Sequence, residues 1–178
     1  VPYKGFFDFE QGKREAKQVD ADGFDAVLRP ASAFSTLGWF NDPLLPTTLA
    51  LDSLELANTV IHELVHTTYY APGQAVFNES LANFVGSRGA ERFFRSRGQS
   101  AAAAEVVARW DDERVFGEFW SALYTSLDSA FAAHPGDRAA RLVARDTVFA
   151  RAREHLRTSL APRLRTMDST GVSRIRLN

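Results

Sequence analysis

The stretch His62-Glu63-Leu64-Val65-His66 carries the strongest signal in this 178-residue chain. Residues four apart share one face of an α-helix, so both histidines can ligate one metal ion while Glu63 points toward a water on that metal. Two imidazoles and a carboxylate in this spacing are typical of zinc hydrolases. The stretch therefore predicts a helix that carries a catalytic zinc site.

The flanking residues predict where this helix begins and ends. Asp52 stands three residues before Glu55, a capping-box-like pair, and good helix formers follow. We expect the helix to run from Asp52 to about Tyr70, with Pro72-Gly73 ending it, because proline lacks a backbone donor and glycine permits reversal of the chain. The metal-binding stretch then lies in the middle of the helix.

Glu79 is the predicted third ligand of the metal. A catalytic zinc usually has three protein ligands and one open position for water. The first helix rises about 7 Å past the metal, and a second helix that starts near Val76 retraces much of that rise by Glu79. Asn83, one turn further on, is predicted to support the site as a neighbour of its ligands.

Three segments of the sequence together resemble a known family, the predicted zinc aminopeptidases of bacteria, which are HExxH metallopeptidases of the gluzincin type. The segments are Val1–Asp8, Ser35–Leu45 and Leu56–Phe84, the last of which contains both HELVH and Phe77-Asn78-Glu79-Ser80. The similarity is strong over the first half of the chain. Beyond Arg92 it is weaker, although Leu123-Tyr124 and the basic helix around Arg141 look similar to the family's C-terminal helices.

This resemblance implies that His62, His66 and Glu79 bind one zinc ion (Zn²⁺) and that Glu63 is the catalytic carboxylate. Members of the family are usually longer at both ends, so we expect this chain to be a fragment or a processed form. An export signal ahead of Val1 would place the parent protein in the bacterial cell envelope or periplasm. The compartment is otherwise open.

The expected fold class is α+β and predominantly helical. It comprises a zincin-like metallopeptidase core, a small N-terminal β-sheet and a helical C-terminal part. Phe9 to Asp20 predicts a charged helix, and Asp25–Arg29 predicts a strand that Pro30 ends. Further helices are expected over residues 101–133 and from Arg138 to about Leu160. We expect one domain over residues 1–178, divided into a mixed part (1–51), a metal-binding helix pair (52–95) and a helical part (100–178).

Two further features concern the substrate. Ser35-Thr36-Leu37-Gly38-Trp39 lies upstream of the metal helix by an interval similar to that of the substrate-binding edge strand in other gluzincins. It either pairs with the backbone of an extended peptide or turns into a core strand. Tyr69, Tyr70 and Tyr124 are candidates for a second oxyanion donor, and Tyr124 is the one we name, although a tyrosine on an apolar helix is more often part of the core.

Composition limits the possible partners. The net charge of −1 and the pI of about 6.5 provide no global attraction to nucleic acid or anionic membrane. The absence of cysteine removes disulfides and thiolate ligands. Ten arginines follow residue 137, and we interpret them as a solvated face paired with acidic groups rather than as a site for an anionic partner. We expect a peptide substrate, no nucleic acid and no membrane span, with the oligomeric state open.

The sequence therefore predicts a zinc metallopeptidase, more specifically an aminopeptidase, in which Glu63 is the general base. Two alternatives stay open. One is a catalytically silent, metal-bound binding module that uses the basic C-terminal helix, and the intact Glu63 argues against it. The other is a zinc amidase that hydrolyses a non-peptide amide with the same residues.

Overall fold

The computed structural model describes residues 4–24, 26–29, 31, 45–168, 171–172, 175 and 177. Within these residues the regular structure is helical. The long helices are α3 (Ser53–Thr68), α4 (Ala75–Ser96), α5 (Ser100–Ala132) and α6 (Arg138–His155). The shorter elements are α1 (Phe9–Ala21), α2 (Pro46–Leu49), the π-helical turn η1 (Leu156–Leu160) and the 3-10 turn η2 (Ala161–Arg163).

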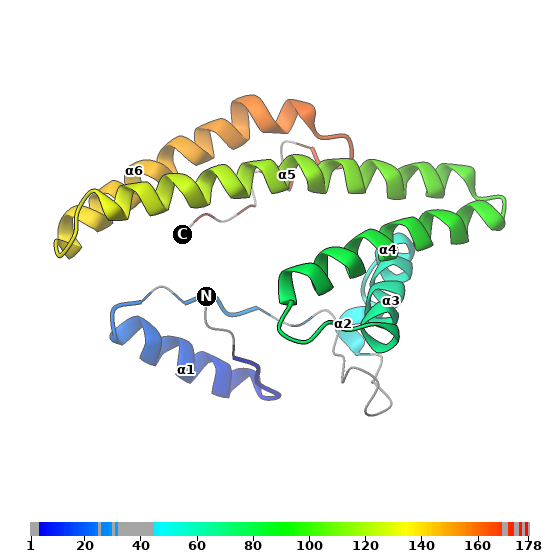
Figure 1. The fold of residues 1–178 in the computed structure, drawn as a ribbon, viewed down its shortest axis with the longest axis horizontal. Helices are drawn as coiled ribbons and strands as arrows, with labels where there is room; N and C mark the ends of the chain where they lie inside the picture. The colour runs from blue at the N-terminus through cyan, green and yellow to red at the C-terminus, as the bar shows by residue number, and fades with distance from the viewer. Residues whose placement is uncertain are drawn as a thin grey trace.

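The long helix α5 organises the molecule by packing on different partners along its length. Figure 1 shows α4 and α3 beside the N-terminal part of α5, and α6 returning along its C-terminal part. One buried cluster joins α4 to the start of α5 through Phe94 and Val106. A second cluster joins α5 to α6, η1 and the C-terminal segment through residues such as Phe119, Leu156 and Leu160. The molecule therefore has two apolar cores that share one helix.

Small residues on α4 let it approach α3 closely. Ala82, Gly86 and Ala90 recur every four residues and so lie on one face of the helix. Ala82 and Ala90 are fully buried. A Cβ atom placed on Gly86 would lie 2.6 Å from Asn58 Oδ1 and 3.0 Å from the backbone oxygen of Asn58. Glycine is therefore required at position 86 for the two helices to cross at this distance.

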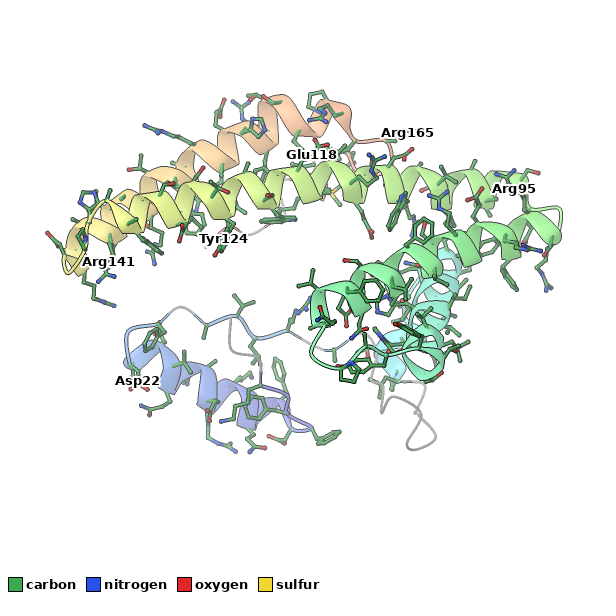
Figure 2. The ribbon with its side chains drawn as sticks, in the orientation of Figure 1. Asp22, Arg95, Glu118, Tyr124, Arg141 and Arg165 are labelled. Atoms are coloured by element: carbon green, nitrogen blue, oxygen red, sulfur yellow. The ribbon has the colours of Figure 1, made fainter. Side chains whose placement is uncertain are left out.

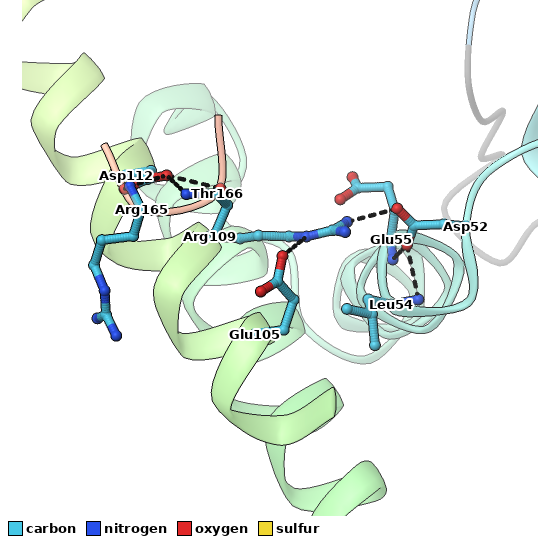
Figure 3. A network of polar contacts seen from close by, with 8 residues as sticks. All are labelled: Asp52, Leu54, Glu55, Glu105, Arg109, Asp112, Arg165 and Thr166. Carbon is cyan, nitrogen blue, oxygen red and sulfur yellow. Dashed lines mark hydrogen bonds and ion pairs between the residues drawn. The ribbon is translucent and has the colours of Figure 1, made fainter. Parts of the chain in front are cut away.

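Asp52 caps α3 and also connects it to α5. Its Oδ1 atom accepts hydrogen bonds from the backbone N–H groups of Leu54 and Glu55, both at 2.9 Å. Arg109 of α5 donates to the other carboxylate oxygen at 2.8 Å, as Figure 3 shows. The bond from the Glu55 N–H and the Arg109 guanidinium hold the pKa of Asp52 below its ordinary value. The charged form of Asp52 therefore stabilises the start of α3.

A second buried carboxylate fastens the C-terminal segment to α5. Asp112 is only 5% exposed and accepts hydrogen bonds from the backbone N–H groups of Arg165 and Thr166 and from the Thr166 hydroxyl. Figure 3 shows this group one turn along α5 from Arg109. Because each donor satisfies the buried charge, Asp112 holds the chain after η2 against the helix.

The predicted α+β fold class is wrong, since no described residue lies in a β-strand. This finding removes both the small N-terminal β-sheet and the zincin-like core that was expected to contain it. Residues 26–29 of the predicted strand have no regular structure, and Asp25 lies outside the described residues. A strand needs a neighbouring strand for its backbone hydrogen bonds. Instead this segment runs beside α1, where Leu28 lies close to Gly12.

The helices expected after Asp52 are present. α3 ends at Thr68, two residues before the predicted end, and the backbone reverses through Gly73, whose φ is +76°. α5 continues through Gly117 without a break. None of the helices in the described part of the chain has the length and apolarity needed to cross a membrane.

The same substitution at two helical glycines should have opposite effects on stability. Gly117→Ala has open space around the new Cβ and should raise the free energy of unfolding by up to about 1 kcal/mol through helix propensity. Gly86→Ala should lower it by about 1–3 kcal/mol, because the new methyl group overlaps Asn58. Urea denaturation of both variants tests this, and equal stabilisation by the two would contradict the close approach of α3 and α4.

Replacing Asp52 should separate its two roles. Asp52→Ala loses the cap and the ion pair and should cost about 1 kcal/mol, whereas Asp52→Asn keeps the cap and should cost less. Since the pKa of Asp52 is lowered on folding, its contribution is complete above the ordinary value of 3.8 and is lost as the pH falls through the folded pKa. The stability difference between wild type and Asp52→Asn, measured by denaturation at pH 7 and pH 3, should shrink at the lower pH.

Candidate metal centre

Three side chains from α3 and α4 converge on one point. The Nε2 atoms of His62 and His66 lie 3.2 Å apart. Glu79 places Oε2 at 3.4 Å from His62 Nε2 and Oε1 at 3.4 Å from His66 Nε2. Their ligand atoms all lie within 4.8 Å of one another, so the group can hold a metal ion.

These separations fit a tetrahedral metal. Donors about 2.1 Å from a zinc ion lie roughly 3.4 Å apart when the angle between them is tetrahedral. The two imidazole nitrogens and the carboxylate oxygens match that spacing. Two histidines and one carboxylate are also a donor set that zinc prefers in catalytic sites, where a fourth position stays open. The residues present therefore fit the metal that the motif implies.

The hairpin between α3 and α4 brings the ligands together. His62 and His66 are one helical turn apart on α3, and their rings meet edge to face with centroids 4.9 Å apart. After Gly73 reverses the chain, Glu79 lies on the second turn of α4. A Cβ atom built on Gly86 would lie 3.3 Å from the Cβ of His62, so α4 passes close to α3 at the first histidine. The close crossing of the helices thus sets the distance between the carboxylate and the imidazoles.

The centre is closed on the histidine side and open on the carboxylate side. The side chain of His66 is 7% exposed and that of His62 is 17% exposed, whereas Glu79 is 62% exposed. Exposed Tyr69, Val76 and Phe77 flank the open side in sequence, and the rings of Tyr69 and Phe77 meet edge to face with centroids 6.3 Å apart. Among the described residues, the side of the centre formed by Glu79 is therefore the more exposed one.

Asn78 fixes the loop that precedes Glu79. Its side-chain oxygen accepts a hydrogen bond from the Ala71 N–H at 2.9 Å, and its amide donates to the Ala71 carbonyl at 2.8 Å. Asn78 is only 2% exposed. A buried side chain held by two bonds has one orientation, so it fixes the start of α4 relative to the end of α3. Asn83, the predicted supporting residue, is exposed, and its role stays a prediction.

Sequence reasoning missed Asn78 although a signal was present. An asparagine amide can pair with both backbone groups of one residue, and this one follows a Pro-Gly turn and directly precedes the third ligand. Helical periodicity favours Asn83 instead, because one helical turn places it on the same side of α4 as Glu79. No hydrogen bond of Asn83 occurs within the described part of the chain. The two hydrogen bonds of Asn78 join its side chain to the backbone of Ala71 in a loop, and helical periodicity cannot predict such bonds.

Glu63 is half-buried on α3 beside the first histidine. Among the described residues it has no ion pair and no side-chain hydrogen bond, so its carboxylate is not engaged by the fold. A catalytic base must be available to the water that it deprotonates. The position and freedom of Glu63 are compatible with that role.

Tyr124, the predicted oxyanion donor, is not brought to the centre. Tyr124 is 72% exposed and lies on the side of α5 that faces α1 (Figure 2). The contact between α5 and α4 includes Trp110, which meets Phe84. Tyr124 lies fourteen residues after Trp110, which is about 21 Å further along the helix. None of the polar or ring contacts in the described part of the chain joins Tyr124 to the ligands. Ser35-Thr36-Leu37-Gly38-Trp39 lies outside the described residues, and its predicted role stays a prediction.

Comparison with known proteins gives one match. A family model described as "Putative aminopeptidase" matches residues 1–170. No curated protein and no solved structure matches the chain. The family match covers both the helix pair that carries the three ligands and the helices α5 and α6, so it extends well beyond the first half of the sequence.

Removing the two bonds of Asn78 should weaken metal binding without unfolding the protein. We expect Asn78→Ala to bind zinc about tenfold less tightly, as is typical when a residue that positions a metal ligand is lost. Asn78→Asp can still accept a hydrogen bond from the Ala71 N–H, so its zinc affinity should lie between those of the wild type and Asn78→Ala. Competition with a chromophoric chelator measures the affinity, and circular dichroism checks the fold. Asn83→Ala is the matched control, and an equal loss in that variant would contradict the role of Asn78.

Proposed function

The chain belongs to this aminopeptidase family, and from that premise we propose that it is a zinc-dependent metallopeptidase of the gluzincin type, which removes N-terminal residues from peptides. The observation that carries the proposal is the convergence of His62, His66 and Glu79 on one point, with Glu63 unpaired beside them. A peptidase of this chemical class requires that ligand set and that base.

His62, His66 and Glu79 would hold the metal, and Glu63 would carry the proton. When bound, zinc supplies a water whose pKa falls to about 7 and a Lewis acid for the scissile carbonyl. Glu63 accepts the proton of the attacking water and then donates it to the amine that leaves. The exposed Glu79 side of the centre admits the substrate, while the buried histidine rings stay fixed. The open side therefore determines where the peptide lies.

The structure supplies no support for the binding-module alternative. Of the eight C-terminal arginines that the structure describes, four pair with acidic side chains: Arg145 with Asp146, Arg157 with Glu154, Arg163 with Glu118 and Arg165 with Asp111. Arg138 and Arg153 donate to backbone carbonyls. These contacts favour the interpretation of a solvated, internally paired face over a site for an anionic partner.

Substitution of the base should separate catalysis from metal binding. We expect Glu63→Gln to lower turnover by about 10²–10⁴-fold while zinc affinity stays unchanged, because an amide cannot take the proton. Glu79→Ala should instead weaken zinc binding. Mass spectrometry of a mixed peptide library incubated with each zinc-loaded variant measures cleavage, and the ends of the products distinguish removal of single N-terminal residues from internal cuts. Full activity of Glu63→Gln would overturn its assignment as the base.

A further inference from the structure

A small pocket lies between α3, α4 and α5, one helical turn before the metal ligands. Its volume of about 20 Å³ holds roughly one water-sized species. Its polar lining comes from all three helices, with Glu55 and Asn58 on α3, Ser87 on α4 and Glu113 on α5. None of these residues belongs to the His62, His66 and Glu79 group.

Two residues that line this three-helix pocket each carry a buried oxygen without a hydrogen-bond partner in the described part of the chain. Ser87 is only 5% exposed, and its Oγ atom has no hydrogen bond in the described part of the chain. The Oδ1 atom of Asn58 is buried and unpartnered in the same way. Buried oxygens rarely stay unsatisfied, because the loss of hydration costs more than a typical hydrogen bond returns. Both residues line the pocket, so a species bound there would satisfy them.

The pocket carries excess negative charge. Glu55 and Glu113 both line it, and neither forms an ion pair within the described residues. Partial burial and the nearby Glu55 carboxylate raise the pKa of Glu113, although its side chain keeps solvent contact. Arg109 also lines the pocket, but its guanidinium is bound by Asp52 and Glu105, as Figure 3 shows. The charge of the two glutamates is therefore left uncompensated.

Donor type and size together identify the class of ligand. Apart from Arg109, the polar lining offers oxygens: two carboxylates, one amide and one hydroxyl. The rest of the lining is apolar and comes from Leu54, Val106 and Trp110. Oxygen-only sites with carboxylates favour hard cations such as Ca²⁺, whereas zinc prefers the nitrogen donors of the histidine site. The small volume suits a single inorganic ion better than an alkylammonium group.

We propose that the three-helix pocket is a second metal site, which binds a hard divalent cation of the Ca²⁺ type through Glu55, Asn58, Ser87 and Glu113. The ion would connect α3, α4 and α5 next to the catalytic hairpin, with water completing its coordination. Its role is structural: it neutralises the two carboxylates and holds together the helices that position His62 and Glu79. The site is independent of the proposed peptidase activity.

Terbium luminescence and thermal denaturation of the zinc-loaded protein test this site. Tb³⁺ replaces Ca²⁺ in oxygen-donor sites and is excited through a nearby tryptophan, and Trp110 lines the pocket. We expect tryptophan-sensitised Tb³⁺ emission that added Ca²⁺ displaces, and a Tm that rises with CaCl₂. Trp110→Phe should abolish the emission but keep the Ca²⁺-dependent rise in Tm, which would locate the ion at this pocket.

The variants separate binding from folding. Glu55→Gln and Glu113→Gln should each weaken Ca²⁺ binding by about tenfold or more, because ligand charge sets the affinity of such sites. In calcium-free buffer Glu113→Gln should unfold at the same temperature as wild type or higher, since it removes a carboxylate whose charge is disfavoured there. Asp128→Asn, an exposed position on the same helix, is the charge-matched control and should respond to Ca²⁺ as wild type does.

Two results would overturn the proposal. One is a wild-type protein whose Tm and terbium emission do not respond to the ions. The other is a response that Glu55→Gln and Glu113→Gln share undiminished, which would place the bound ion elsewhere. Neither result bears on peptide cleavage, so this site and the proposed function are tested separately.

Discussion

The close crossing of α3 and α4 is the constraint on which the rest of the structure depends. Gly86 provides no side chain at the point where Asn58 and His62 pass, and this absence sets the distance between the two helices. The same distance determines whether Glu79 reaches the two imidazoles, and it also shapes the pocket above them that Asn58 and Ser87 line. One contact therefore determines both the packing and the geometry of the site. A larger side chain at position 86 would push α4 away from α3, and this shift would move the Glu79 carboxylate as well.

The two apolar cores on α5 stabilise different parts of the molecule. The cluster around Phe94 and Val106 supports the metal-bearing hairpin, and the cluster around Phe119, Leu156 and Leu160 holds the C-terminal helices. Two carboxylates provide polar links between elements. The exposed Asp52 pairs with Arg109 of α5, and the buried Asp112 accepts hydrogen bonds from the backbone that follows η2. Several donors satisfy the charge of Asp112, which is the condition under which a buried carboxylate stabilises a fold.

The helical hairpin and the convergence of His62, His66 and Glu79 could be predicted because their signals are local. The Asp52 cap, the Pro72-Gly73 stop and the four-residue histidine spacing each act within one or two turns of chain, and the bounds of α3 follow from them. The N-terminal strand could not be predicted correctly. Whether an extended segment pairs depends on a distant partner, and residues 26–29 contact α1 instead. Asn78 was missed for a similar reason, since its role depends on the path of the loop.

The position of the three ligands also has a kinetic consequence. His62, His66 and Glu79 all fall within one short stretch of sequence, and the chain between the helices is a tight turn. Closing so short a loop costs little conformational entropy and takes well under a microsecond in flexible chains, on the order of 10–100 ns for ten residues. The ligand set is thus complete as soon as the hairpin forms, before the long-range contacts of the C-terminal helices. A metal ion bound by this group would therefore stabilise the hairpin itself.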